Sequence, residues 1–107
     1  IAILSIGSCD DAVQEARDQL AAEGVATNYL RVVAFPFNQQ VQDFLDHHDR
    51  IYVVEQNRDA QLRSLLLLET KVEQDKLVPV LHYSGLPLNA AAVVDAISED
   101  LARGQAA

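Results

Sequence analysis

Short apolar runs alternate along the sequence with stretches in which apolar residues recur at helical spacing. The run at residues 51–54, Ile-Tyr-Val-Val, contains no polar residue, which is typical of a strand buried on both faces of a sheet. Three further runs are interpreted as strands: residues 1–6, 25–33 and 77–83. Pro79 removes an amide donor from the last of these, so we expect that strand at an edge of the sheet.

A helix is predicted after each strand. The first has Val13, Ala16 and Leu20 on one side, and Gly24 suits the left-handed residue that ends such a helix. The next helices are expected after residue 38, over residues 59–73, and from residue 89 to about 103. Their apolar residues are Val41, Phe44 and Leu45, then Leu62 and residues 65–68, then Val93, Val94, Ile97 and Leu101. The residues expected to cap helix starts are Ser8 or Asp10, Asn38 and Asn89.

The third of these helices contains four consecutive leucines, residues 65–68. Adjacent positions on a helix point in different directions, so four leucines in a row cover more than one helix face. Either this helix is nearly enclosed, or part of it is covered by another chain or domain. We predict that the run is partly an interface.

Strands and helices that alternate through short connections favour a parallel sheet with helices on both faces. Right-handed crossovers restrict the arrangement further, and we predict the strand order 2-1-3-4. The fold class is therefore α/β, a three-layer α/β/α sandwich around a mainly parallel four-stranded sheet. A chain of 107 residues is long enough for one domain that buries roughly two-thirds of its unfolded surface. We expect that domain over residues 1–103, followed by a frayed tail at residues 104–107.

A crevice is expected where the first and third predicted strands end, because ligands or partners meet open α/β sheets at such a point. Gly7 and Ser8 follow the first strand, and Glu55, Gln56 and Asn57 follow the third. Gly7-Ser8 lacks the glycines and the lysine of nucleotide-binding motifs, so a structural turn is favoured over an anion site. Glu55 has no second carboxylate or histidine placed to share proton transfer. A strut to helix amides, or an interface, is therefore favoured over catalysis for Glu55.

Two other features have ordinary structural interpretations. An exposed Cys9 at a helix start would have a lowered thiol pKa, but a lone cysteine there is more often packed in a core. His47 and His48 resemble a metal pair, yet adjacent helical residues point about a hundred degrees apart. Stabilisation of a helix C-terminus is the simpler role for them. We therefore assign no catalytic, cofactor-binding or metal-ligating residue.

Composition narrows the classes of partner. A net charge of −8 and a pI near 4.6 argue against nucleic acid or an anionic membrane surface as the main partner. The single cysteine excludes an internal disulfide and any four-cysteine metal site. No apolar run approaches the length of a membrane span and no signal peptide is visible, so we expect a cytoplasmic protein. Because the sequence has no Met and Ile1 already lies in an apolar run, we expect a chain cut from a longer one.

Several short motifs together resemble the C-terminal domain of the alpha subunit of 2-oxoacid:ferredoxin oxidoreductases. In order, they are Ile6-Gly7-Ser8; Leu30-Arg31 leading to Pro36-Phe37; Val53-Val54-Glu55-Gln56-Asn57 with Gln61-Leu62; and Tyr83-Ser84-Gly85-Leu86-Pro87-Leu88. The resemblance covers essentially the whole chain, and Val-Glu-Gln-Asn followed by Gln-Leu is its most specific part. The sequence departs from the family pattern at Asn38, Arg58 and Ala60, where a proline, an aromatic residue and a glycine are usual.

This resemblance implies a transketolase C-terminal-like fold, with an additional antiparallel edge strand before Ile1. It also implies that the parent enzyme converts a 2-oxoacid to an acyl-CoA by oxidative decarboxylation. The implied cofactors of the parent enzyme are thiamine diphosphate, magnesium and iron–sulfur clusters, none of which is expected to bind to this fragment. Coenzyme A is the implied co-substrate of the parent enzyme. The implied partners are the other domains of the alpha subunit, the thiamine-binding beta subunit and, through the complex, ferredoxin. The expected role is non-catalytic organisation of subunits and domains.

Two alternatives remain open from the sequence. The C-terminal domain of a 2-oxoacid dehydrogenase E1 beta chain or of a transketolase shares this fold. Those proteins commonly have His-Glu in place of Glu55-Gln56, and Leu-Asp in place of Phe37-Asn38. The other alternative is a free-standing module that binds a small anion in a crevice between Ser8 and Asn57.

Overall fold

Within the described residues, four parallel strands form one sheet in the order β2-β1-β3-β4, which confirms the predicted order. In this computed structural model the described residues are 1–6, 9–32, 37–56, 60–82 and 88–106, with side chains to residue 103. The strands are β1 (Ala2–Ile6), β2 (Asn28–Val32), β3 (Ile51–Glu55) and β4 (Leu77–Leu81). The helices are α1 (Asp10–Ala22), α2 (Gln39–Asp46), α3 (Gln61–Glu69), the short 3-10 helix η2 (Gln74–Lys76) and α4 (Ala90–Ala106).

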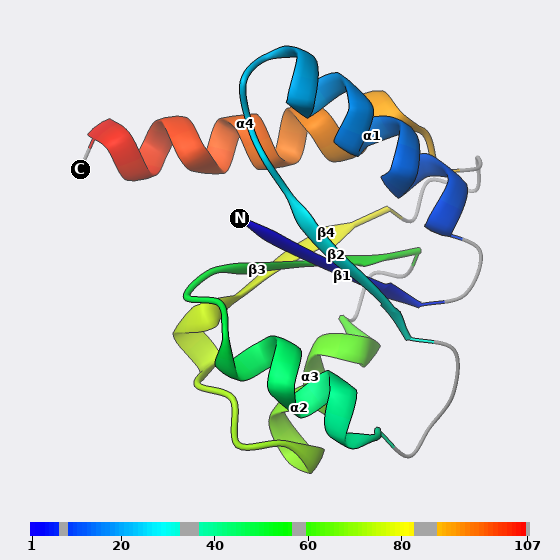
Figure 1. Ribbon diagram of the computed structural model, residues 1–107, viewed down its shortest axis with the longest axis vertical. Helices are drawn as coiled ribbons and strands as arrows, with labels where there is room; N and C mark the ends of the chain where they lie inside the picture. Colours follow the sequence, from blue (N-terminus) through cyan, green and yellow to red (C-terminus); the bar gives the residue numbers. More distant parts are fainter. Residues whose placement is uncertain (7–8, 33–36, 57–59, 83–87, 107) are drawn as a thin grey trace.

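The sheet separates two helical layers, as Figure 1 shows: α1 and α4 cover one face, and α2 and α3 cover the other. Successive residues of the central strand β3 point to opposite faces and so contribute to two cores. Tyr52 and Val54 belong to the core under α1 and α4, whereas Ile51 and Val53 belong to the core under α2 and α3. All five residues of β3 are buried, which confirms the burial predicted for the apolar run at residues 51–54.

β2 is shorter than predicted, because its expected first residues complete the end of α1. The amide of Gly24 donates to the Ala21 carbonyl and that of Val25 to the Leu20 carbonyl, at 3.0 and 2.8 Å. This pair of bonds is a Schellman motif, and Gly24 takes the left-handed conformation that it requires, with φ of 85°. Strand pairing therefore begins at Asn28 rather than at residue 25.

Two helix boundaries also differ from those predicted. α3 (Gln61–Glu69) ends before residue 73, since the Thr70 hydroxyl donates to the Leu66 carbonyl at 2.5 Å and Thr70 itself is extended. α4 continues to Ala106, so the tail expected from residue 104 is helical up to that residue. The caps expected at Asn38 and Asn89 are confirmed, with Oδ1 accepting from the amides of Val41 and Ala92 at 3.2 and 2.9 Å.

β4 lies at the edge of the sheet, as Pro79 predicted. β3 is its one neighbour among the described strands, and Pro79 stands opposite Val53. Arg63 of α3 reaches the start of this strand, where its Nε donates to the Leu77 carbonyl at 3.2 Å and its second terminal nitrogen to the Gln74 carbonyl at 3.3 Å. A side chain therefore joins α3, η2 and the beginning of β4.

The four leucines of α3 divide between core and surface. Leu66 is fully buried in the core under α2 and α3, while Leu65 and Leu67 are half-buried. Leu68 is 79% exposed, more than any other large hydrophobic residue among those described. The run is therefore not simply core, and its role as an interface stays a prediction.

Candidate functional site

Glu55, the last residue of β3, connects the sheet to the start of α3. Its side chain is 1% exposed. One carboxylate oxygen accepts from the Leu62 amide at 2.5 Å and the other from the Arg63 amide at 3.1 Å. Amides in the first turn of a helix have no partner within the helix, so this carboxylate satisfies them and also lies at the positive end of the helix dipole. The observed geometry is that of the predicted strut.

Cys9, at the start of α1, contacts the backbone of Gln56, the residue that follows β3. Cys9 is 2% exposed, and burial raises the pKa of its thiol. A hydrogen bond with the backbone of Gln56 acts in the opposite direction, and the nearby charge of Glu55 adds to the increase. A buried thiol with a raised pKa is not an activated nucleophile, which supports the packing interpretation of Cys9. Gly7, Ser8 and Asn57 lie outside the described residues, so the predicted crevice between the ends of β1 and β3 stays a prediction.

Asp10, at the start of α1, ends a hydrogen-bonded chain that runs through the hydroxyl groups of Ser5 in β1 and Tyr29 in β2, which the sequence did not reveal. Ser8 or Asp10 was expected to cap this helix. Asp10 is instead the first helical residue, Cys9 occupies the N-cap without a side-chain cap bond, and Ser8 lies outside the described residues. Instead, Asp10 accepts from the Tyr29 hydroxyl at 2.8 Å. That hydroxyl is also 2.5 Å from Oγ of the buried Ser5, which must then be the donor to it.

Burial raises the pKa of Tyr29 to about 12, against a smaller effect of the bond from Ser5, and the Asp10 carboxylate adds to the increase. Arg17 of α1 lies over the Tyr29 ring, 5.5 Å from its centroid, and donates from Nε to the Thr27 hydroxyl at 2.9 Å. These contacts hold α1 against β1 and β2 and need no ligand. They define a structural network at this end of the sheet.

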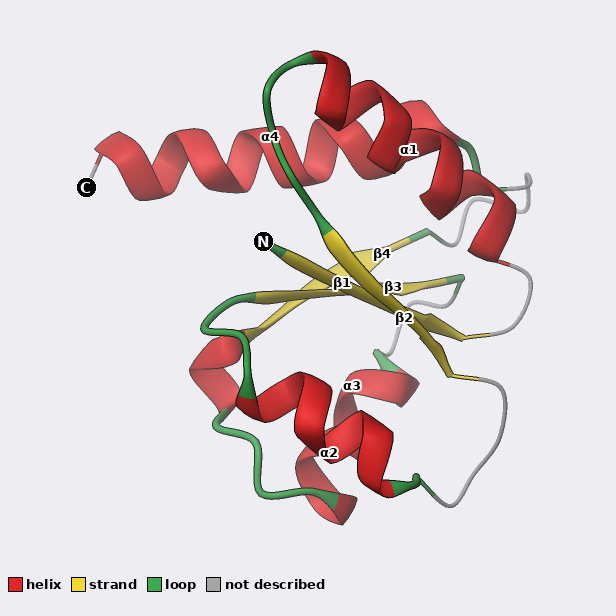
Figure 2. Ribbon diagram, in the orientation of Figure 1, coloured by secondary structure: helices red, strands yellow, loops and turns green. Residues whose placement is uncertain are grey.

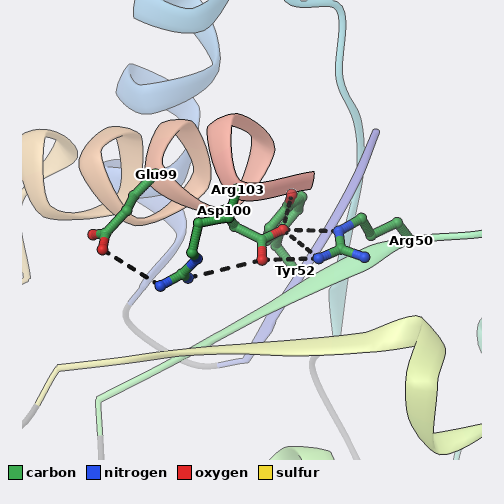
Figure 3. Close-up of polar contacts among 5 residues, drawn as sticks. All are labelled: Arg50, Tyr52, Glu99, Asp100 and Arg103. Atoms are coloured by element: carbon green, nitrogen blue, oxygen red, sulfur yellow. Dashed lines mark hydrogen bonds and ion pairs between the residues drawn. The ribbon is translucent and has the colours of Figure 1, made fainter. Parts of the chain in front are cut away.

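A second buried network joins the start of β3 to α4 (Figure 3). Asp100 of α4 is 9% exposed and accepts from the Tyr52 hydroxyl at 2.7 Å and from Nε of Arg50 at 2.8 Å. A second Arg50 nitrogen donates to the other carboxylate oxygen at 2.8 Å, so the guanidinium binds in a bidentate manner. Arg103 is more distant, 3.9 Å from the same carboxylate, and it also contacts Glu99 at 3.4 Å.

These contacts change the pKa values of the groups involved. The hydrogen bond from Tyr52, helped by Arg50, holds the pKa of Asp100 below its usual value in spite of desolvation. Burial and the bond to Asp100 raise the pKa of Tyr52. The charge of Asp100 is therefore retained in a largely buried position. Sequence reasoning missed this network, although Asp100 falls three and seven residues after the buried Ile97 and Val93.

His47 and His48 lie at the end of α2, where both rings bond to the last carbonyls of that helix. Nδ1 of His47 is 2.6 Å from the Asp43 carbonyl, and Nδ1 of His48 is 2.7 Å from the Phe44 carbonyl. Nε2 of His48 contacts the Asn28 side chain at 3.1 Å. Each ring thus serves the helix C-terminus, as the simpler interpretation held. In the part of the chain that the structure describes, no group of three or more His, Cys, Asp or Glu residues is arranged to hold a metal ion.

The elements above define a class: a three-layer α/β/α domain whose buried charged groups, Glu55 and Asp100, bind to its own helices and strands. No described helix is both long and apolar enough to cross a membrane. Comparison with protein-family models finds no match.

Comparison with known proteins gives the particular relatives. The chain is 30% identical, over 107 residues and 98% of its length, to the alpha subunit of 2-oxoacid:ferredoxin oxidoreductase 2 from Aeropyrum pernix. Its structure matches the 2-oxoglutarate:ferredoxin oxidoreductase of Magnetococcus marinus, determined with 2-oxoglutarate, coenzyme A and succinyl-CoA bound, with a TM-score of 0.81, 26% identity and 92% of this chain covered. The chain spans 16% of the first relative's length and 17% of the second chain.

A third match concerns the fold. The alpha chain of a probable 2-oxoacid ferredoxin oxidoreductase from Thermoplasma acidophilum has a TM-score of 0.61 and 24% identity, with 94% of this chain and 86% of that chain covered. The fold described above therefore accounts for most of that alpha chain. The resemblance to 2-oxoacid:ferredoxin oxidoreductase alpha subunits, expected from the sequence motifs, is confirmed over nearly the whole chain.

Proposed function

We propose that this chain is a non-catalytic domain, the C-terminal one, of the alpha subunit of a 2-oxoacid:ferredoxin oxidoreductase. The observation that carries the proposal is the match of 98% of the chain to 16% of such an alpha subunit, supported by the TM-score of 0.81. A single folded domain that corresponds to about a sixth of a longer relative acts as one part of a larger assembly. The reaction of the intact complex would be oxidative decarboxylation of a 2-oxoacid to an acyl-CoA, with ferredoxin as electron acceptor.

The placement of the buried charges supports an organising role. A catalytic carboxylate must reach the substrate or a bound water. Both oxygens of Glu55 instead accept from amides of α3, and those of Asp100 accept from Arg50 and Tyr52. These groups hold helices against the sheet and so give the domain a fixed shape. A fixed shape is what a domain needs in order to organise its neighbours.

The cofactors of the proposed reaction do not fit the residues described. Iron–sulfur clusters are held by sets of cysteine thiolates, whereas this chain has one cysteine, which is buried. No described cluster of carboxylates is arranged to hold a magnesium ion. We therefore assign thiamine diphosphate, magnesium and the iron–sulfur clusters to other parts of the complex. The partners would be the other domains of the alpha subunit and the thiamine-binding beta subunit, in the cytoplasm.

The proposal is tested with the full-length alpha subunit that contains this segment, purified together with its partner subunit. With thiamine diphosphate, magnesium and coenzyme A added, the complex should reduce a viologen dye in a 2-oxoacid-dependent manner. The 107-residue chain alone should give no turnover above a heat-killed control. Turnover by the chain alone, or the failure of every 2-oxoacid tried to support dye reduction by the complex, would overturn the proposal.

A further inference from the structure

We draw no further inference here: the strongest candidate, the polar groove of about 500 Å³ between α2 and residues 69–71 at the end of α3, on the side of the sheet opposite α1 and α4 (Figure 2), carries none because nothing in the structure shows what covers it.

Discussion

Replacing Tyr52 with Phe tests how far the fold depends on the buried Asp100 carboxylate. Tyr52 is fully buried and its hydroxyl donates to Asp100 at 2.7 Å. Phenylalanine keeps the ring and nearly the same volume, so the cavity contribution stays small. A hydrogen bond to a charged group contributes about 1.5–3 kcal/mol, and we expect about 2 kcal/mol because Arg50 still pairs with Asp100. For a domain of this size that loss lowers Tm by about 8–16 °C.

The same change has a predicted pH dependence. The pKa of Asp100 is lower in the folded protein than its unfolded value of about 3.9, and the Tyr52 bond is the main cause. A group of this kind contributes stability above its unfolded pKa and loses the contribution as pH falls through its folded pKa. The difference in unfolding free energy between wild type and Tyr52→Phe should therefore be full at neutral pH and shrink below about pH 4. Urea unfolding of both proteins across this range measures it.

A matched control removes a charge near the same carboxylate without removing a buried bond. Arg103 is 69% exposed and lies 3.9 Å from Asp100, so Arg103→Gln should cost less than about 0.5 kcal/mol. Equal Tm values for Tyr52→Phe and wild type at neutral pH would refute the reasoning. A difference that does not change from neutral pH to about pH 3 would show that the lost stability does not come from the ionised carboxylate.

Three further predictions concern other parts of the fold. Glu55→Gln should lower the stability of the domain by about 1.5–3 kcal/mol in denaturant unfolding, because the charge-assisted bonds to Leu62 and Arg63 weaken. An unchanged melting temperature together with a slower intact enzyme would instead make Glu55 part of a functional site. Ala60→Gly should stabilise the domain by about 0.5–1 kcal/mol, since Ala60 has a left-handed φ of 52°, and a lower Tm would contradict this. Tyr29 has a folded pKa of about 12, above its unfolded value of about 10. Neutral Tyr29 should therefore contribute to the stability of the folded domain below about pH 10, and this contribution should be lost as pH rises through about 12. Wild type should accordingly lose more stability over that interval than Tyr29→Phe, and parallel pH profiles of the two proteins would rule the explanation out.

The strand order was predictable because the four apolar runs and the short connections leave few arrangements of a parallel sheet. The role of Glu55 was predictable for a similar reason: a carboxylate at the end of a buried strand requires donors, and helix amides are the nearest ones. Both inferences depend only on the order of the elements along the chain and on residues that are close in the sequence. They required no knowledge of contacts between distant side chains.

The network of Arg50, Tyr52 and Asp100 was not predictable in that way, since Arg50 and Asp100 are 50 residues apart in the chain. One signal was available: Asp100 occupies the buried side of α4, where an unpaired carboxylate would be costly. The end of α3 was missed because the stop depends on a hydroxyl bond from Thr70 to the Leu66 carbonyl, which helical spacing alone does not reveal. The start of β2 was missed because apolar Val25 suits a strand, although its amide completes the end of α1.

The way in which β4 ends the sheet has a consequence for behaviour at high concentration. An exposed edge strand can recruit a strand from a neighbouring molecule, which is a route to aggregation and fibril formation. Pro79 lacks one of the amide donors that such pairing requires, and Arg63 already binds the Leu77 carbonyl. A strand from another molecule would therefore find an interrupted row of donors and an occupied acceptor along β4. This side of the sheet protects the protein against growth by strand addition.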